Sequence, residues 1–423
     1  MLSIDSENGK HRYCDGVSRR SFLQLGALTA GGISLADLLH AEADAGIGSS
    51  NKAIINIHLG GGPAHQDTFD LKPEAAREFR GEFHPIHTTV SGMDICEHLP
   101  ELAKNAEKFA VVRSMTGSVA DHSDHHTHTG FNRSSMKNIG GRPSIGSVAA
   151  KLLGSQKGAP PFIGYNGSYP GYLGAVYKPY RPKGGNLKLN KQVTAQRLQS
   201  RTDLLKGLDR LRRGLDNSGQ MDALDAYTQR AVDVVTSGRV ANALDMKTAD
   251  KKTRERYGKS GDMFLRARRL VEVGVRVVSF SWGGWDTHSN NFKHLRGQLP
   301  KLDRSLSALL NDLHDRGMEK DVTVVMWGEF SRTPRVNKNA GRDHWYPVAM
   351  CFLAGGGMRT GQVVGRTNKN AEVAVDRPIH IQEVFATLYH NLGIDVRSQT
   401  ITDPGGRPQY LVNHQNPIHE LIS

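Results

Sequence analysis

Cysteine is scarce in this chain, with three residues among 423. Cys14 falls in an N-terminal segment that we expect to be removed, which leaves Cys96 and Cys351. These two allow one disulfide at most, in an oxidising compartment. Cys351 lies inside the apolar run 348–354, which favours a buried thiol at that position.

Long apolar runs are also missing. The apolar stretch near the N-terminus, residues 25–39, spans about 15 residues and contains three glycines, which is too short and too weakly apolar for a membrane span. It follows the twin-arginine box SRRSFLQ at 18–24 and precedes an Ala41-x-Ala43 cleavage pattern. We therefore predict that residues 1–43 are a twin-arginine signal peptide, and that the mature chain is periplasmic or secreted without a transmembrane span. The alternative is a chance arginine pair before a buried helix.

The export route also bears on the site. The twin-arginine machinery, here a predicted partner, moves folded proteins, and one common reason to fold before export is the loading of a metal or cofactor in the cytoplasm. The signal therefore favours a site that is filled before export.

The composition is that of a globular protein, with 38% apolar and 23% charged residues. The net charge is +13, and basic residues concentrate at 178–213 and 247–269. No nucleic-acid motif accompanies this charge and the predicted destination is outside the cytoplasm, which argues against nucleic acid as a partner. A sulfated or phosphorylated polyanionic substrate, an anionic cell-surface polymer and a merely solvated basic face remain as explanations.

Periodicity predicts the fold class. Short apolar runs predict buried strands at 53–59, 109–115, 275–281, 322–326 and 348–353. Apolar residues at three- and four-residue steps predict helices at 291–316 and 380–392. Strands that alternate with helices indicate an α/β fold with a mainly parallel sheet sandwiched by helices.

We expect one domain at 51–423 that includes a basic helical insertion at about 190–272, which forms a lid or a partner surface. Before the insertion, residues 160–182 are rich in Gly, Pro and Tyr and predict a long ordered loop. Its tyrosines either line a carbohydrate site or pack against the rest of the domain.

Potential metal ligands follow the ends of the predicted strands or precede the last one. They are His65, Asp67, Asp286, His288, Glu329 and His344. The run DHSDHHTH at 121–128 follows the second strand and places His122, His125 and His126 on one face if it is helical. Because functional side chains of parallel sheets lie at the carboxyl ends of strands, we expect these residues to meet.

Imidazoles and carboxylates together suit zinc, manganese or iron, whereas oxygen ligands alone suit magnesium or calcium. We predict a divalent metal, zinc in the first place, with Mn, Fe or Ca as alternatives. The predicted ligands are Asp286, His288, Glu329, His344, His65, Asp67, His122 and His126. Two metals about 4 Å apart would stabilise the attacking and leaving oxygens of a displacement at phosphorus or sulfur. Taken singly, each histidine would more often be a hydrogen-bonded structural residue.

Longer motifs resemble a known family. They are GGGPAHQDTFDLKP, DHSDHHTHTG, GGWDTH, WGEFSRTP followed by GRDHW, and GGGMRTGQVVGRTN. They are similar to a widespread family of exported bacterial proteins of unknown function, often labelled sulfatase-like and placed at the edge of the alkaline phosphatase superfamily. The resemblance covers nearly all of the mature chain and implies an alkaline phosphatase or sulfatase-like α/β fold.

The superfamily resemblance extends to single residues. Asp286 with His288 resembles the aspartate and histidine pair that follows a late strand, at shorter spacing, and Glu329 stands where an aspartate is usual. His344 resembles the last histidine ligand, which precedes a strand ending in glycines. Gly60 stands near the place of the first acidic ligand, and this departure argues against the two-metal version.

The resemblance leaves the nucleophile open. The sulfatase signature, Cys or Ser-x-Pro-x-Arg, is absent, since Cys96 is followed by EHLP. Ser123, Thr127 or Thr129, in the segment that corresponds topologically to the superfamily's nucleophile, would attack if a metal lowered the pKa of the hydroxyl. Water activated by the metal is the equal alternative.

Two arginines flank the predicted cluster. Arg332 and Arg342 either grip the anionic group of a substrate bidentately or form salt bridges with neighbouring acids.

These features predict an exported metal-dependent hydrolase of sulfate or phosphate esters. The alternative is an exported binding or surface-assembly protein of the same fold that has lost catalysis, which the lack of an identifiable nucleophile favours. Convergence of the strand-end residues in one pocket favours the enzyme, and dispersal favours the binding protein. Nucleic-acid hydrolysis has only the charge in its support.

Overall fold

A computed structural model describes residues 51–167, 169–182 and 238–422. The predicted signal peptide at 1–43 and the part of the predicted insertion before residue 238 lie outside the described residues.

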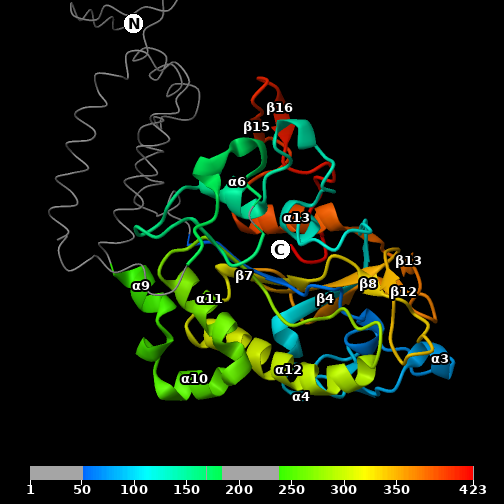
Figure 1. The fold of residues 1–423 in the computed structure, drawn as a ribbon. Coiled ribbons are helices and arrows are strands. Elements are labelled where there is room, and N and C mark those ends of the chain that lie inside the picture. Colours follow the sequence, from blue (N-terminus) through cyan, green and yellow to red (C-terminus); the bar gives the residue numbers. More distant parts are fainter. Residues whose placement is uncertain (1–50, 168, 183–237, 423) are drawn as a thin grey trace, which may run out of the picture. The chain divides into compact units, whose positions relative to one another are not determined.

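An eight-stranded sheet forms the centre of the described part (Figure 1). Its strands are β1 (Ala53–His58), β4 (Phe109–Thr116), β5 (Phe162–Gly164), β6 (Val277–Ser281), β7 (Val322–Trp327), β10 (Ala349–Gly355), β11 (Gln362–Val364) and β14 (Ile379–His380). The order is β11-β4-β10-β7-β1-β6-β5, and β14 also pairs with β4.

The sheet is parallel except for one strand. β1 pairs in parallel with β6 and β7, and β5 with β6, while β11 and β14 run parallel to β4. β10 lies between β7 and β4 and is antiparallel to both. The carboxyl ends of β1, β4, β6 and β7 therefore meet at one edge, together with the amino end of β10.

Helices cover both faces of this sheet (Figure 1). They are α3 (Arg77–Arg80), α4 (Pro100–Ala103), α5 (His126–Thr129), α6 (Ile145–Leu152), α9 (Arg239–Leu244), α10 (Lys251–Tyr257), α11 (Asp262–Glu272), α12 (Asn291–Asp315) and α13 (Ile381–Asn391). Ile55 and Ile57 of β1 share a buried cluster with residues of α4, α11 and α12, whereas Ile54 shares one with α6 and α13. This alternation explains why β1 and β7 are buried at every position.

Four two-stranded sheets complete the described part. They are β2 (Pro85–Ile86) with β3 (Ile95–Cys96), β8 (Ser331–Arg332) with β9 (His344–Trp345), β12 (Arg366–Thr367) with β13 (Ala374–Asp376), and β15 (Thr400–Thr402) with β16 (Pro408–Tyr410). The pairing of β8 with β9 aligns Arg332 with His344, so it fixes the chain on either side of the loop that carries the GRDHW motif.

The predicted fold class is confirmed, because the sheet is mainly parallel and lies between helices. The apolar runs became β1, β4, β6, β7 and β10, and the two periodic segments became α12 and α13. The predicted loop at 160–182 also contains β5, an edge strand of three residues that is too short for its periodicity to be recognised. Residues 262–272 of the predicted insertion form α11, and Phe264 and Leu270 of this helix lie in the core rather than on a lid.

Neither described cysteine is in a disulfide, and both side chains are buried. Burial raises the pKa of the Cys96 thiol to about 12 and that of the Cys351 thiol well above its ordinary value. Both are therefore protonated and unreactive at neutral pH.

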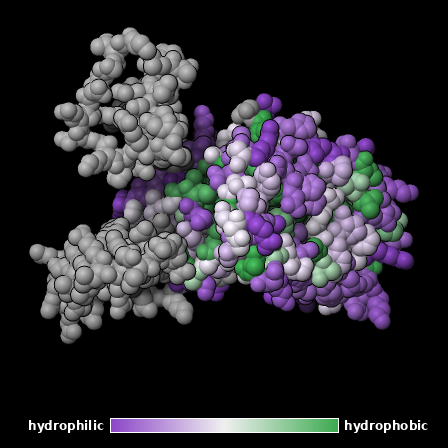
Figure 2. All heavy atoms as spheres, turned by 90° about the horizontal axis from the view of Figure 1, so that it is seen from above, coloured by the Kyte–Doolittle hydropathy of each residue, from purple (hydrophilic) through white to green (hydrophobic). Residues whose placement is uncertain are grey.

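In the part of the chain that the structure describes, no helix combines the length and apolar character that crossing a membrane requires. On the face in Figure 2, apolar residues form small groups among hydrophilic ones.

Candidate metal centre

The predicted ligands come from loops at the edge of the sheet where β4, β6 and β7 end. His122 follows β4, and Asp286 follows β6. His344 reaches the same edge from the other direction, because it precedes β10, the antiparallel strand. Because β10 is antiparallel to its neighbours, a residue that precedes it, His344, lies at the carboxyl ends of β4, β6 and β7.

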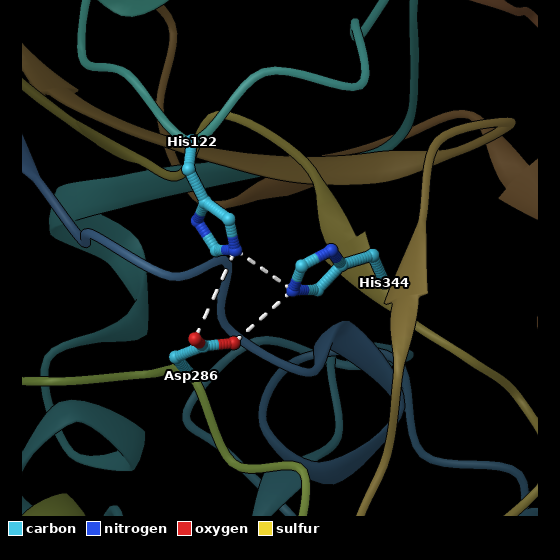
Figure 3. A group of neighbouring side chains, drawn as sticks. All are labelled: His122, Asp286 and His344. Atoms are coloured by element: carbon cyan, nitrogen blue, oxygen red, sulfur yellow. Dashed lines mark hydrogen bonds and ion pairs between the residues drawn. The ribbon is translucent and has the colours of Figure 1, made fainter.

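His122, Asp286 and His344 face one another at this edge (Figure 3). Nε2 of His122 lies 2.9 Å from Nε2 of His344, which lies 3.1 Å from Oδ1 of Asp286. Nε2 of His122 lies 3.8 Å from Oδ2 of Asp286. The His122 and Asp286 side chains are about half exposed and that of His344 is 22% exposed, so the group opens to solvent on one side.

His288 borders the same group. Its Nε2 lies 3.0 Å from Nε2 of His344 and 3.0 Å from Oδ1 of Asp286. Four of the eight predicted ligands, His122, Asp286, His288 and His344, therefore converge, and the ligand atoms of His122, Asp286 and His344 all lie within 4.8 Å of one another.

The second nitrogen of each imidazole has its own polar partner. Nδ1 of His288 lies 2.7 Å from Oδ1 of Asp343, and Nδ1 of His122 lies 3.3 Å from Oε1 of Glu329. Nδ1 of His344 lies 3.4 Å from the hydroxyl of Tyr346. Carboxylates behind metal-bound histidines commonly fix the ring orientation and the tautomer in this way.

These partners determine which nitrogen carries the proton. The pKa of Asp343 is lowered by its hydrogen bond with His288, so this carboxylate is ionised and requires a proton on Nδ1 of His288. In the neutral ring, Nε2 then presents a lone pair to the Asp286 carboxylate and to His344. Such an arrangement is repulsive unless a cation lies between these atoms or the ring takes up a second proton.

The protonation states suit a metal. Burial lowers the pKa of His344, which favours the neutral ring that binds metals. Burial raises the pKa of Asp286, but hydrogen bonds from Arg332 and His344 outweigh it and bring the pKa to about 2.

The distances suit a metal as well. Ligand atoms about 2.1 Å from a tetrahedral zinc ion lie roughly 3.4 Å from one another. The closest pairs around His344 lie at 2.9, 3.0 and 3.1 Å. The residues therefore fit the predicted divalent ion.

Glu329, a predicted ligand, lies behind His122 rather than in the group of three. Its side chain is 2% exposed, and Oε1 accepts a hydrogen bond from the backbone N–H of Gly61, at 2.8 Å. Burial raises the pKa of this carboxyl group. A glycine is required at position 61, where φ is +99° and a Cβ atom would collide with the backbone of Asp286.

The guanidinium groups of Arg332 and Arg342 form hydrogen bonds and ion pairs within the protein. Arg332 is buried, donates to the carbonyls of Gly61, Gly62 and Arg342, and contacts the Asp286 carboxylate through Nη2. It therefore orients Asp286. Arg342 is also buried and forms a bidentate pair with Asp67, with both N···O distances at 2.7 Å.

Three predicted ligands are not brought to the group. Both oxygens of Asp67 are engaged by Arg342, and one also accepts from Nδ2 of Asn291. His65 is buried with Nδ1 against Ser331 and Nε2 3.1 Å from the carbonyl of Ala371. His126 is buried in α5, and burial lowers its pKa to about 4.

The three predicted nucleophiles occupy different environments. Thr129 is buried, and its hydroxyl donates to the carbonyl of His125 at 2.9 Å. The hydroxyl of Ser123 is half-buried and donates to Oδ2 of Asp121 at 3.0 Å. Thr127 is fully buried, and its Oγ1 lies 2.9 Å from Nδ1 of His58 and donates to the carbonyl of Asp124. None of these hydroxyls contacts the group of ligands in the part of the chain described here.

His58 belongs to the site but was not predicted. It ends β1, and its Nε2 lies 3.5 Å from Oε2 of Glu329, so it connects Thr127 to the carboxylate behind His122. Burial lowers its pKa to about 4. The signal that could have identified it is the pair Asn56 and His58, polar residues at alternate positions in an otherwise apolar strand.

A model of the family described as "Protein of unknown function (DUF1501)" matches residues 51–422. The curated proteins contain no match to this chain.

Several solved structures share part of the fold. Ps i-CgsB in complex with k-i-k-neocarrahexaose is 13% identical, with 82% of this chain and 72% of that chain covered and a TM-score of 0.37. The lipoteichoic acid synthase LtaP from Listeria monocytogenes is 11% identical, with 82% and 72% covered and a TM-score of 0.34. The PsFucS1 sulfatase from Pseudoalteromonas sp. is 10% identical, with 85% and 70% covered and a TM-score of 0.36.

Proposed function

This chain belongs to the DUF1501 family, whose description names no activity, and we propose from the geometry of its site that it is an exported, metal-dependent hydrolase of sulfate or phosphate esters. The observation that carries the proposal is the convergence of His122, His288 and His344 on Asp286, with a carboxylate fixing the tautomer of His288.

Each residue has a distinct part in this proposal. His122, Asp286, His288 and His344 would hold the ion, which we expect to be zinc, with Mn, Fe or Ca as alternatives. When bound, such an ion supplies Lewis acidity toward the oxygens of a sulfate or phosphate ester. Asp343 and Glu329 orient His288 and His122, and Arg332 orients Asp286. The exposed side of the group admits the anionic ester from solvent.

The first test is the metal content of the chain purified after native export. We expect near-stoichiometric zinc, manganese or iron, lost in His344→Ala and retained in His87→Ala, a control at a histidine whose side chain is 96% exposed. Absence of metal from the native chain, persisting after supplementation, would contradict the metal centre.

The second test is hydrolysis of 4-nitrophenyl sulfate and 4-nitrophenyl phosphate by the metal-loaded chain. We expect one ester class to be hydrolysed, with the activity removed by chelation and restored by the metal. Stoichiometric metal without hydrolysis of either class, or of a wider panel of sulfated and phosphorylated sugars, would contradict the reaction while leaving the metal centre in place.

Export is proposed from the sequence alone, since residues 18–24 lie outside the described part. Replacing Arg19 and Arg20 by lysine should retain the precursor in the cytoplasm, as measured by fractionation. Normal export of this variant would remove the twin-arginine route and, with it, the argument that the site is filled before export.

A second candidate is a binding or surface-assembly protein that holds the metal without catalysis. The burial of Thr127 favours it, because this hydroxyl is engaged by His58 and by a backbone carbonyl and does not contact the ligands. An acidic polymer that binds the metal-loaded chain and remains chemically unchanged would identify this second candidate.

A further inference from the structure

An open cavity of about 560 Å³ adjoins the candidate metal centre at Asp286. Its walls are the loop from Gly284 to Asn290 and the first turn of α12, which contributes Lys293 and His294. Asp286 belongs both to this cavity and to the ligand group, so the cavity and the metal centre share one wall residue.

The charges of this cavity are unbalanced. Lys293 and His294 are both exposed, and Lys293 forms no ion pair with any acid of the described residues. Asp286 is the acid of the lining, and its carboxylate is already engaged by Arg332, His288 and His344. The ammonium group of Lys293 therefore faces the cavity without a protein anion to neutralise it.

The walls are fixed in place. The hydroxyl of Thr287 donates to Oδ1 of Asn291 at 2.6 Å, and the backbone N–H of Asn290 donates to the carbonyl of Asn339 at 3.0 Å. Nδ2 of Asn337 donates to the carbonyl of His288 at 3.0 Å. Binding in this cavity would therefore need little ordering of the loop, which favours affinity.

We propose that this cavity is a subsite for a second anionic group of the substrate, a sulfate, phosphate or carboxylate that binds beside Lys293 and His294 while the reacting ester lies at the metal centre. The inference rests on the proposed function and specifies its substrate class as esters that carry at least two anionic groups. Ser289 and Asn290 add neutral polar groups to the same wall, and the N-terminus of α12 adds partial positive charge.

The test that does not depend on catalysis is calorimetry on the zinc-loaded full chain with two probes, a disaccharide with one sulfate and the same disaccharide with two. We expect the disulfated sugar to bind with a dissociation constant about fivefold lower, because one exposed ion pair changes an affinity by up to about this factor. Lys293→Gln should remove this difference, and His294→Gln should reduce it.

Lys301→Gln is the matched control, because it removes the same charge from an exposed position of the same helix, away from the cavity. Equal binding of the two sugars to the native chain would overturn the subsite, and so would an equal loss of affinity in Lys293→Gln and Lys301→Gln. The latter result would indicate general attraction by the basic surface.

Steady-state kinetics test the subsite separately from the hydrolytic reaction. For a 4-nitrophenyl ester that carries a carboxylate on the leaving group, Lys293→Gln should raise KM about fivefold with little change in kcat, and for the ester without the carboxylate it should change neither. Equal changes for both esters would overturn the subsite. Absence of hydrolysis together with the calorimetric difference would instead refute the reaction and leave the subsite standing.

Discussion

At the scale of single residues, the site depends on groups that lie behind the ligands. Asp343 and Glu329 do not belong to the group of three, yet they determine how His288 and His122 present Nε2. Their effect on metal affinity can be measured without any knowledge of the substrate.

Asp343→Asn should weaken zinc binding about 10- to 100-fold, because the amide no longer holds the His288 ring as a charged acceptor does. A competitive chelator titration measures the affinity. Asp376→Asn, at an exposed position of β13, is the control and should leave the affinity unchanged. An equal affinity in Asp343→Asn and the native chain would mean that His288 is not an oriented ligand.

Thr127→Val tests the buried hydroxyl. We expect the free energy of unfolding to fall by about 1 kcal/mol, since the hydrogen bond to His58 is lost, while the zinc content stays the same. Thr127→Ser should restore the stability. If Thr127→Val were instead stable and metal-loaded but inactive toward an ester that the native chain hydrolyses, the hydroxyl would be the nucleophile.

At the scale of elements, the buried pair of Asp67 and Arg342 connects the turn after β1 to the loop that carries Asp343 and His344. Both side chains are fully buried, and Arg342 also donates to the carbonyls of Thr333, Pro334 and Phe79. The pair therefore holds the loop in position from a place outside the ligand group.

Asp67→Asn should lower the free energy of unfolding by about 3 kcal/mol, because it leaves the Arg342 charge buried without its partner. Urea unfolding measures this loss. Glu82→Gln, in the half-exposed pair with Arg296, is the control and should cost at most about 1 kcal/mol. An Asp67→Asn variant as stable as the native chain would contradict this structural role of the pair.

The elements that could be predicted from the sequence are those with a long repeating signal. The central strands are mostly apolar, and the eight leucine and phenylalanine positions of 291–316 recur at helical steps, so both kinds of element can be identified. β5, β11 and β14 have three residues or fewer, and they form because they hydrogen-bond to longer neighbouring strands. Their own residues are too few to show a periodic pattern, so they could not be predicted from the sequence.

The site was only partly predictable for a related reason. Position at a strand end brings His122, Asp286, His288 and His344 together, as expected for this architecture. Asp67 has the same kind of position, but it lies in a 3-10 turn that buries it against Arg342. Whether a side chain after a strand turns toward the edge or into the core depends on partners distant in sequence, here 275 positions away.

At the scale of the whole molecule, buried histidines make stability depend on pH. Burial lowers the pKa of His65 and of His126 to about 4, whereas unfolded histidines titrate near 6.5. Between these values the unfolded chain binds protons that the folded chain does not. The stabilising contribution is therefore complete above about pH 6.5 and is lost as the pH falls toward 4.

The free energy of unfolding of the chelator-treated chain should accordingly fall between pH 6.5 and 4.5, as measured in urea. Asp303 acts in the opposite direction, because burial raises its pKa to about 6, so the sharper test is the difference between the native chain and His65→Gln. The free energy of unfolding of His65→Gln should fall less between pH 6.5 and 4.5 than that of the native chain. Parallel curves for the two proteins would contradict the assignment of a buried neutral ring to His65.

The order of the strands has a consequence for how the chain acquires its ligand set. β1 lies between β6 and β7, whose residues come more than two hundred positions later, so the centre of the sheet closes over very long loops. His344 lies just before β10, which pairs with both β7 and β4. An ion that needs all of these loops binds the native state and no earlier one. At a free concentration of about 1,000 times its dissociation constant, such an ion would add about 4 kcal/mol to the free energy of unfolding. Thermal unfolding with and without metal therefore measures how strongly the ion stabilises the assembled sheet and its loops.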